Sequence, residues 1–482
     1  MAMQEGHAMS FSRRQALAIL GGAAVALHGC GPRADTGRRA ADVIVLGAGL
    51  SGLNAALILE QAGLDVLVLE ASGRVGGRMK TLDQLPGRPE AGGSQVGQTY
   101  ARIRARCAQF AIAMEGFAPN AFGEVLSVRG ETMAAADWPA AGPNRLPEAL
   151  KPVPPSRLLF SIAARRNPLP DIYAWREPAW QDHDVAAAAW LEAAGANAEA
   201  LRLMDVSLNG LSLETYSMMN LWRSLSIYAQ DRAIGPSQAI AGGSQRLPEA
   251  MAGALSREVR LNAPAAAIAA DASGAAVTTE DGETLRADFL VSALPFPVLR
   301  RLALQVPFGP AQREAIEALP YTPILQLHLE AETAFWDEDG LPPEMWTDTA
   351  LERIFAGRAA DGAPTGMLTA WIDGTGGLAA DALSDEDLQA LARRTLARIR
   401  PASEGRVRLA HVQRWTPSNP LAGGAYMHWA PGQIARWAEP MIAPAGRLFI
   451  AGEHAGVLHT GMEAAMEAGE RAALAILDAA GA

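Results

Sequence analysis

The sequence predicts an α/β fold whose first unit is a parallel strand–helix–strand crossover, and three observations support this prediction. The run from Asp42 to Leu46 is apolar and β-branched, as expected of a buried parallel strand. A glycine-rich turn follows, and the segment from Leu53 to Gln61 then has the apolar spacing of a helix. A second apolar run starts at Leu64 and ends on the acidic Glu70.

Length and composition limit the class of protein. A chain of 482 residues predicts two or three domains, since domains average about 150 residues. Hydrophobic residues make up 49% and charged residues 19% of the chain, which excludes wholesale disorder. The formal net charge of −11 argues against nucleic acid as a partner. Two cysteines, Cys30 and Cys107, are too few for a disulfide scaffold, and no histidine–carboxylate spacing suggests a metal site.

The start of the chain indicates an export signal. Arg13 and Arg14 form a twin-arginine pattern before the apolar run Ala16–Leu27, which is shorter than the roughly 20 residues that span a bilayer. The run ends at Cys30 in a sequence that resembles a lipoprotein cleavage box; the alternative is a simple cleaved signal in which Cys30 is incidental. Residues 31–40 are expected to form a polar tether. Because this route exports folded proteins, the sequence predicts a periplasmic protein with a tightly bound cofactor and Cys30 as a candidate lipid anchor.

The turn after the first strand has the spacing of a dinucleotide site. Gly47, Gly49 and Gly52 form a G-x-G-x-x-G motif between a strand and a helix. The first glycine permits the tight turn, the second lets the backbone approach a pyrophosphate at the helix N-terminus, and the third allows close helix packing. Glu70, 18 residues after Gly52, is placed to bind a ribose. The alternative is a glycine-rich turn that binds no ligand.

A second glycine pair favours a flavin over a nicotinamide dinucleotide. Arg74, Gly77 and Arg78 lie in an R-x-G-G-R sequence directly after the second strand, which is similar to a flavoprotein pattern. With this motif the chain resembles the flavin-dependent amine oxidase family, which includes monoamine and polyamine oxidases and bacterial nicotine oxidoreductases. Further segments resemble the family in the same order; they are Glu90–Gly97, Ala241–Leu247, Asp288–Pro295, Leu448–Glu453 and Met462–Ala473.

The resemblance implies a Rossmann-like FAD-binding domain with an inserted α+β substrate domain, the two-domain fold of amine oxidases. Residues 1–40, the signal and tether, lie outside both domains. The FAD-binding domain is expected to combine three stretches, which are 41–117, 236–318 and 407–482. The substrate-binding domain is expected to combine residues 118–235 and 319–406.

Two inserted segments carry local predictions. Residues 138–180 are rich in proline and tryptophan, which indicates irregular, lid-like structure. Ser384 is the expected N-cap of an amphipathic helix that runs to about Ile399. Acidic residues fill its first turn and arginines its later turns, as the helix dipole favours, so we expect a solvated face there.

The resemblance also implies which residues hold non-covalent FAD. Covalent members carry a flavin-linked cysteine where this chain has Ala425. The expected cofactor-binding residues are Gly47, Gly49, Gly52, Glu70, Arg74, Gly77, Arg78, Gly93, Ser94, Trp415, Gly452, Glu453 and Met462.

Gln326 departs from the family. It lies on the expected strand Ile324–Leu329, at the position of the family's active-site lysine, which typically holds a water against flavin N5. The chain has only two lysines, Lys80 and Lys151, and neither is expected near Gln326. A glutamine can hold a water but cannot carry charge or move a proton. We therefore expect poor use of oxygen and a preference for a periplasmic electron carrier; the alternative is that Gln326 simply packs in the core.

The expected substrate site also departs from the family. Tyr426 matches one wall of the family's aromatic cage, whereas the opposite wall falls on Gly461. His459 and Trp429 are candidates for the missing wall, and each has an alternative interpretation as a structural residue. Gln326 and Tyr426 are thus the candidate catalytic residues.

The resemblance implies an enzyme that oxidises a small-molecule amine by hydride transfer to flavin N5, giving an imine that hydrolyses to an aldehyde or ketone. Gln326 and Gly461 favour an alternative, a flavin desaturase or protoporphyrinogen-oxidase-like enzyme that acts on a carbon–carbon bond. A third interpretation is a non-catalytic flavoprotein electron relay. Amino-acid oxidation is less favoured, because no arginine motif for a substrate carboxylate lies near Gly93 and Ser94.

Overall fold

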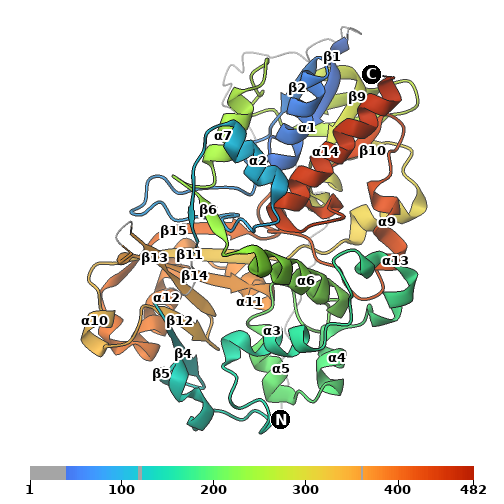
Figure 1. Ribbon diagram of the computed structural model, residues 1–482. Coiled ribbons are helices and arrows are strands. Elements are labelled where there is room, and N and C mark those ends of the chain that lie inside the picture. Colours follow the sequence, from blue (N-terminus) through green and yellow to red (C-terminus); the bar gives the residue numbers. More distant parts are fainter. Residues whose placement is uncertain (1–38, 118–121, 360–361, 482) are drawn as a thin grey trace, which may run out of the picture.

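The computed structural model describes residues 39–117, 122–359 and 362–481 and contains two large sheets (Figure 1). The predicted twin-arginine signal and Cys30 lie outside the described residues. The first strand begins at Arg39, so the last two residues of the predicted segment 1–40 belong to the fold rather than to a tether. Across the described ranges, no helix combines the length and apolar content needed to cross a bilayer.

The first sheet contains the predicted crossover. Strands β1 (Arg39–Leu46) and β2 (Val66–Leu69) pair in parallel and are joined by α1 (Leu50–Gln61). All of β2 and the second half of β1 are buried, which explains their apolar composition. The strand order is β10 (Ala303–Gln305), β7 (Ala265–Ala270), β8 (Ala275–Thr279), β9 (Thr284–Ser292), β1 and β2, and β16 (Leu448–Ile450) also pairs with β9.

Helices from both ends of the chain pack on this sheet. The last helix, α14 (Gly461–Ala480), lies along α1, and Gly469 permits the approach because a side chain there would overlap the Ser51 carbonyl (Figure 1). The other helices of this half are α2 (Ala101–Gln109), α7 (Arg246–Gly253), α8 (Phe296–Leu299), α9 (Pro310–Ala318) and α13 (Ile434–Trp437).

The second sheet is built from the inserted segments and one additional strand. Its order is β15 (Val407–Trp415), β11 (Ile324–Ala331), β14 (Pro364–Asp373), β13 (Arg353–Arg358), β12 (Glu344–Thr347), β4 (Glu124–Val128) and β5 (Glu131–Ala134). The predicted boundary at residue 407 is therefore too early, because β15 pairs with β11 along its whole length.

Helices of the inserted segments cover the second half of the molecule. Ser384 caps α12 (Asp385–Ile399) by accepting a hydrogen bond from the Asp387 amide at 3.1 Å, as predicted. The segment 138–180 is not wholly irregular, because it contains α3 (Pro155–Arg165). The remaining helices are α4 (Ala187–Ala193), α5 (Ala198–Asp205), α6 (Met218–Ile234), α10 (Trp336–Asp339) and α11 (Gly374–Asp381).

The two halves meet where the candidate site lies. Strands β3 (Met114–Gly116) and β6 (Gln238–Ile240) form a small sheet at the crossing between them. Helix α6 runs across the middle of the molecule, between the first sheet and the helices of the insertion (Figure 1). The site is thus lined by α6, by β11 and β15 of the second sheet, and by the loops of the first sheet.

Candidate active site between the two sheets

The start of α1 forms an anion-binding cradle. Gly47 has φ +97°, which only glycine adopts readily, and Gly49 is the N-cap of α1 without a side-chain cap. A Cβ on Gly49 would meet no protein atom within 4 Å, whereas a Cβ on Gly52 would overlap the Gly47 carbonyl oxygen. The first turn of α1 holds no acidic residue. Open space before free helix amides would fit a pyrophosphate, the group that the sequence analysis expects at this turn.

Glu70 lies beside this cradle at the end of β2. Its carboxylate accepts hydrogen bonds from the Ala48 and Ser72 amides, both at 2.8 Å, and therefore fixes the turn that precedes α1. A carboxylate has about four acceptor positions, so capacity for ribose hydroxyls remains. Sequence reasoning assigned Glu70 to the ribose alone and did not foresee its bonds to the turn.

The two arginines of the second glycine motif have different surroundings. Arg74 donates to the Val75 and Met79 carbonyls and to the Gln245 side chain, so it braces its own loop. Arg78 donates to the Ala425 carbonyl at 2.7 Å and contacts the Glu453 carboxylate at 3.3 Å. Arg78 therefore links the first cofactor segment to the last.

The remaining predicted cofactor residues come together from distant segments. A Cβ on Gly93 would lie 2.8 Å from the Met462 sulfur, and Ser94 is half-buried beside it. The Trp415 indole donates to the Ala91 carbonyl. Gly452 has φ +108° and its amide donates to the Ser51 hydroxyl of α1 at 2.7 Å.

Glu453 is the acid at the centre of this arrangement. It accepts a hydrogen bond from the Met427 amide at 3.2 Å, and burial raises the pKa of its carboxyl. Glycines such as Gly49, together with Arg78 and the buried Glu453, thus come from separate stretches of chain to the region of the cradle. They offer the kinds of donors and acceptors that an adenine dinucleotide requires.

Gln326 lies on the sheet face that looks toward these loops. It is opposite Trp371 of β14 and Gln413 of β15, and it is almost completely buried. Its carbonyl oxygen lies 3.2 Å from His328 Nε2. Gln413 accepts a hydrogen bond from the Lys80 ammonium at 2.7 Å. Lys80, which the sequence analysis did not expect near Gln326, therefore reaches the strand β15 that pairs with the strand of Gln326.

Tyr426 interacts with two other tyrosines, and a fourth tyrosine interacts with one of those two. The hydroxyl groups of Tyr216 and Tyr228 act electrostatically on that of Tyr426, and Tyr228 acts on Tyr100. Burial raises the pKa of all four, so all are neutral phenols at neutral pH. Tyr228 nevertheless keeps 39% of its surface accessible.

Sequence reasoning did not identify Tyr100, Tyr216 or Tyr228 as members of this group. Tyr216 lies just before α6, Tyr228 lies within α6, and Tyr100 is the N-cap of α2. At Gly461, where the family's second cage wall was expected, only the Tyr100 hydroxyl lies within 4 Å of a Cβ position, at 3.7 Å. The rarity of tyrosine in the chain was the one available signal.

The two predicted candidates for the second wall have structural partners. Trp429 is 1% exposed and packs against Trp175 at 6.1 Å in the core. His459 Nδ1 accepts the Thr460 amide at 3.0 Å, so Nε2 carries the proton and donates to Thr99 at 2.8 Å. Both ring nitrogens of His459 are thus used within the protein.

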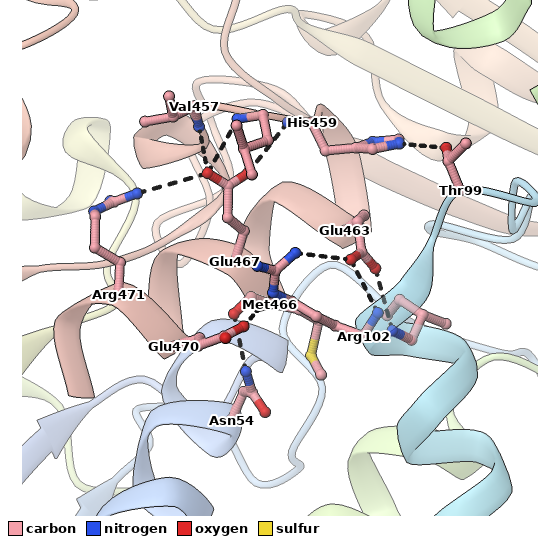
Figure 2. A network of polar contacts seen from close by, with 12 residues as sticks. Asn54, Thr99, Arg102, Val457, His459, Glu463, Met466, Glu467, Glu470 and Arg471 are labelled. Carbon is pink, nitrogen blue, oxygen red and sulfur yellow. Dashed lines mark hydrogen bonds and ion pairs between the residues drawn. The ribbon is translucent and has the colours of Figure 1, made fainter. Parts of the chain in front are cut away.

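The loop that precedes α14 is held from both sides, and Figure 2 shows the side held by Glu467 of α14. The Glu467 carboxylate accepts hydrogen bonds from three successive amides, those of Val457, Leu458 and His459, at 2.9–3.1 Å. On the other side, the buried Arg223 guanidinium of α6 donates to the His459 carbonyl at 2.7 Å. This clamp fixes the chain that leads to Gly461 and Met462.

A buried group of charges lies behind Tyr426. Arg353 pairs with Asp373 and donates to the Asn209 side chain at 3.0 Å. The Asp373 amide donates to the Glu352 carboxylate at 2.8 Å, and burial raises the pKa of Glu352. The charge of Arg353 is thereby balanced within the protein.

Comparisons with known proteins agree with this geometry. A family model described as "Flavin containing amine oxidoreductase" matches residues 50–477. Amine oxidase [flavin-containing] B of Sus scrofa is 26% identical over 464 residues, covering 91% of this chain and 86% of that protein. L-amino-acid oxidase BmooLAAO-I of Bothrops moojeni is 25% identical over 465 residues, covering 89% and 88%.

Solved structures share the fold. Putrescine oxidase bound to putrescine superimposes with a TM-score of 0.71 at 24% identity, covering 91% of this chain and 99% of that chain. Cyclohexylamine oxidase from Brevibacterium oxydans IH-35A superimposes with a TM-score of 0.71 at 23% identity, covering 92% and 100%. The predicted two-domain α/β fold is confirmed.

Proposed function

The chain belongs to the flavin-containing amine oxidoreductase family, a family that uses FAD, and on that premise we propose that it oxidises a small-molecule amine. Bound FAD supplies the acceptor for a hydride from the carbon next to the amine nitrogen, and the imine product then hydrolyses to an aldehyde or ketone. The observation that carries the proposal is the group of tyrosines around Tyr426. Tyr426 follows Ala425 in the chain, and the Ala425 carbonyl accepts a hydrogen bond from Arg78, one of the expected FAD-binding residues.

The protein's part in the reaction is to bind, orient and exclude water. The helix amides at Gly49 and the acids Glu70 and Glu453 would hold FAD without a covalent bond, since residue 425 is alanine. Tyr426 and Tyr228 would hold the amine, because aromatic faces attract an ammonium ion and their apolar rings keep water from the reacting carbon.

An amine without a carboxylate fits this site better than an amino acid. A substrate carboxylate needs an arginine with free donors and an unbalanced charge. Arg353 acts electrostatically on the Tyr426 hydroxyl and its Nε has no partner among the described residues, but its charge is already balanced by Asp373. The L-amino-acid oxidases among the relatives make this a distinction that experiment must test.

We further propose that the protein is exported folded to the periplasm. The support is the twin-arginine pair Arg13 and Arg14 before a short apolar run, with Cys30 as the proposed lipid attachment site. Cell fractionation of the full chain tests this, with R13K/R14K as the export-deficient variant. A membrane-bound protein that Cys30→Ser releases in soluble form would support the anchor.

Anaerobic mixing tests the reaction itself. The purified holoprotein is mixed with primary monoamines, putrescine, cyclohexylamine, L-amino acids, polyenes and porphyrinogens, and loss of yellow absorbance is followed. Reduction by an amine supports the proposal, whereas reduction only by a carbon–carbon substrate supports the desaturase alternative. No reduction by any class supports an electron relay.

A matched pair of variants locates the site. Tyr426→Ala should slow reduction by at least tenfold, a loss of the size expected for a positioning contact, while leaving FAD bound. Tyr173→Ala alters a tyrosine that is 55% exposed and serves as the control. Equal rates in the two variants would contradict the assignment of Tyr426.

A further inference from the structure

Lys80 is a half-buried cation without an acidic partner. Its ammonium donates to the neutral Gln413 side chain at 2.7 Å, and among the described residues no carboxylate lies within ion-pair distance of it. Burial and the neighbouring Arg74 charge both lower its pKa. Lys151, the only other lysine, is instead paired at the surface with Glu148 at 2.8 Å.

The side chains of the paired strands beside Lys80 are neutral, and the carboxylate that acts on them, Asp385, is already paired with Arg414. Gln413 lies opposite Gln326, and His411 lies opposite His328, on the paired strands β15 and β11. Burial, together with the positive charge of Lys80, lowers the pKa of both histidines, that of His328 to about 3. Both imidazoles are therefore neutral at neutral pH.

Lys80 therefore lies closer to Gln326 than the sequence analysis expected when it predicted poor use of oxygen. That expectation assumed that no lysine lies near Gln326. Lys80, from the loop after β2, donates to Gln413, and Gln413 is the residue of β15 that lies directly opposite Gln326. Strand β11 has Gln326 where the family has a lysine, and the nearby positive charge is supplied instead by Lys80, which follows the first sheet's strand β2.

Lys80 also lies within the group of predicted FAD-binding residues. Its carbonyl accepts the Ala91 amide at 2.8 Å, and the Ala91 carbonyl accepts the Trp415 indole. It is two residues from Arg78, which contacts Glu453. A partly buried charge without an ion partner lowers stability, and groups with shifted pKa values of this kind are enriched at functional sites.

We propose that the Lys80 ammonium is the cation that supports reoxidation of the reduced FAD by molecular oxygen. This inference rests on the proposed function, because it concerns the second half of the same reaction. Reduced anionic FAD gives two electrons and a proton to O2, a second proton comes from solvent, and the products are oxidised FAD and H2O2. The first electron makes oxygen an anion, which a fixed positive charge in a poorly hydrated site stabilises.

The test separates reoxidation from amine oxidation. FAD in the holoprotein is reduced anaerobically with dithionite or light, so no amine substrate is needed, and reoxidation is followed after mixing with oxygenated buffer. The variants are K80M, K80Q and K80R, with K151M as the matched control. The midpoint potential of the bound FAD is measured in each as a readout independent of turnover.

We expect K80M and K80Q to reoxidise roughly tenfold or more slowly, with a lower midpoint potential, while K80R and K151M stay close to wild type. If K80M does not retain FAD, the amide of K80Q keeps a donor for Gln413 and replaces it. Unchanged reoxidation and potential in K80M and K80Q would overturn the proposal. An equal loss in K80R, or a wild type that O2 reoxidises no faster than free FAD, would also overturn it.

Discussion

The contrast between Gly49 and Gly52 gives a sharp test of the cofactor cradle. Gly49 has backbone angles that alanine adopts freely, φ −78° and ψ 177°, and a methyl group there meets no protein atom. The methyl would instead occupy the space before the helix amides. Loss of one hydrogen bond to a charged phosphate costs about 1.5–3 kcal/mol. Gly49→Ala should therefore raise the Kd for FAD by about 10- to 150-fold.

The Gly49→Ala variant should lose affinity for FAD without a matching loss in its free energy of unfolding. The unfolding free energy of the apoprotein carrying Gly49→Ala should stay within about 1 kcal/mol of wild type, because an unstrained alanine stiffens the unfolded chain while glycine is the better N-cap. Gly52→Ala should behave in the opposite way, because its methyl overlaps the Gly47 carbonyl. We expect a loss of about 2 kcal/mol or more from this overpacking.

Two assays on the same apoproteins separate these effects. Quenching of FAD fluorescence on titration gives the Kd, and urea unfolding without FAD gives the free energy of unfolding. A wild-type Kd for Gly49→Ala would refute the assignment of this space to the pyrophosphate. An undiminished unfolding free energy for Gly52→Ala would refute the reasoning on helix packing.

Three further predictions concern the scaffold. Arg223→Met removes the donor of the loop clamp and leaves the buried His459 carbonyl without a partner, while Glu467 keeps its ion pair with Arg471, so urea unfolding should show a loss of about 2 kcal/mol; a loss below 1 kcal/mol would contradict the clamp. Ser384→Ala should cost about 1 kcal/mol by the same assay, and Ser384→Asn should restore it. Glu352 has a raised pKa, so the folded state holds its proton more tightly and loses stability as pH rises above about 4.3. Glu352→Gln should therefore raise the melting temperature more at pH 8 than at pH 5, and equal gains would contradict this.

The sequence predicts well those features that depend on neighbours along the chain. The β1–α1–β2 crossover is encoded in one continuous segment, with glycines at the turn and an acid at the end of the second strand. The helix after Ser384 has its cap and its charge order within fifteen residues. Both appear in the structure as predicted.

Contacts between distant segments could not be predicted in this way. Lys80 and Gln413 are 333 positions apart, and their contact depends on how two sheets face each other. Helix α6 buries residues on several faces, from Met218 to Asp231, so its apolar pattern does not reveal that Tyr228 interacts with Tyr426. The sheet membership of β15 depends on strand pairing with β11, which no local pattern states.

Strand β16 has a consequence for the order of events during synthesis. It inserts beside β9 in the first sheet, although nearly the whole chain separates it from β1 on the other side of β9. The nucleotide-holding half therefore cannot close until the ribosome has released the carboxy-terminal end, because contacts of such long sequence separation form late. A nascent or truncated chain would expose the edge of β9 and would remain unable to retain its prosthetic group.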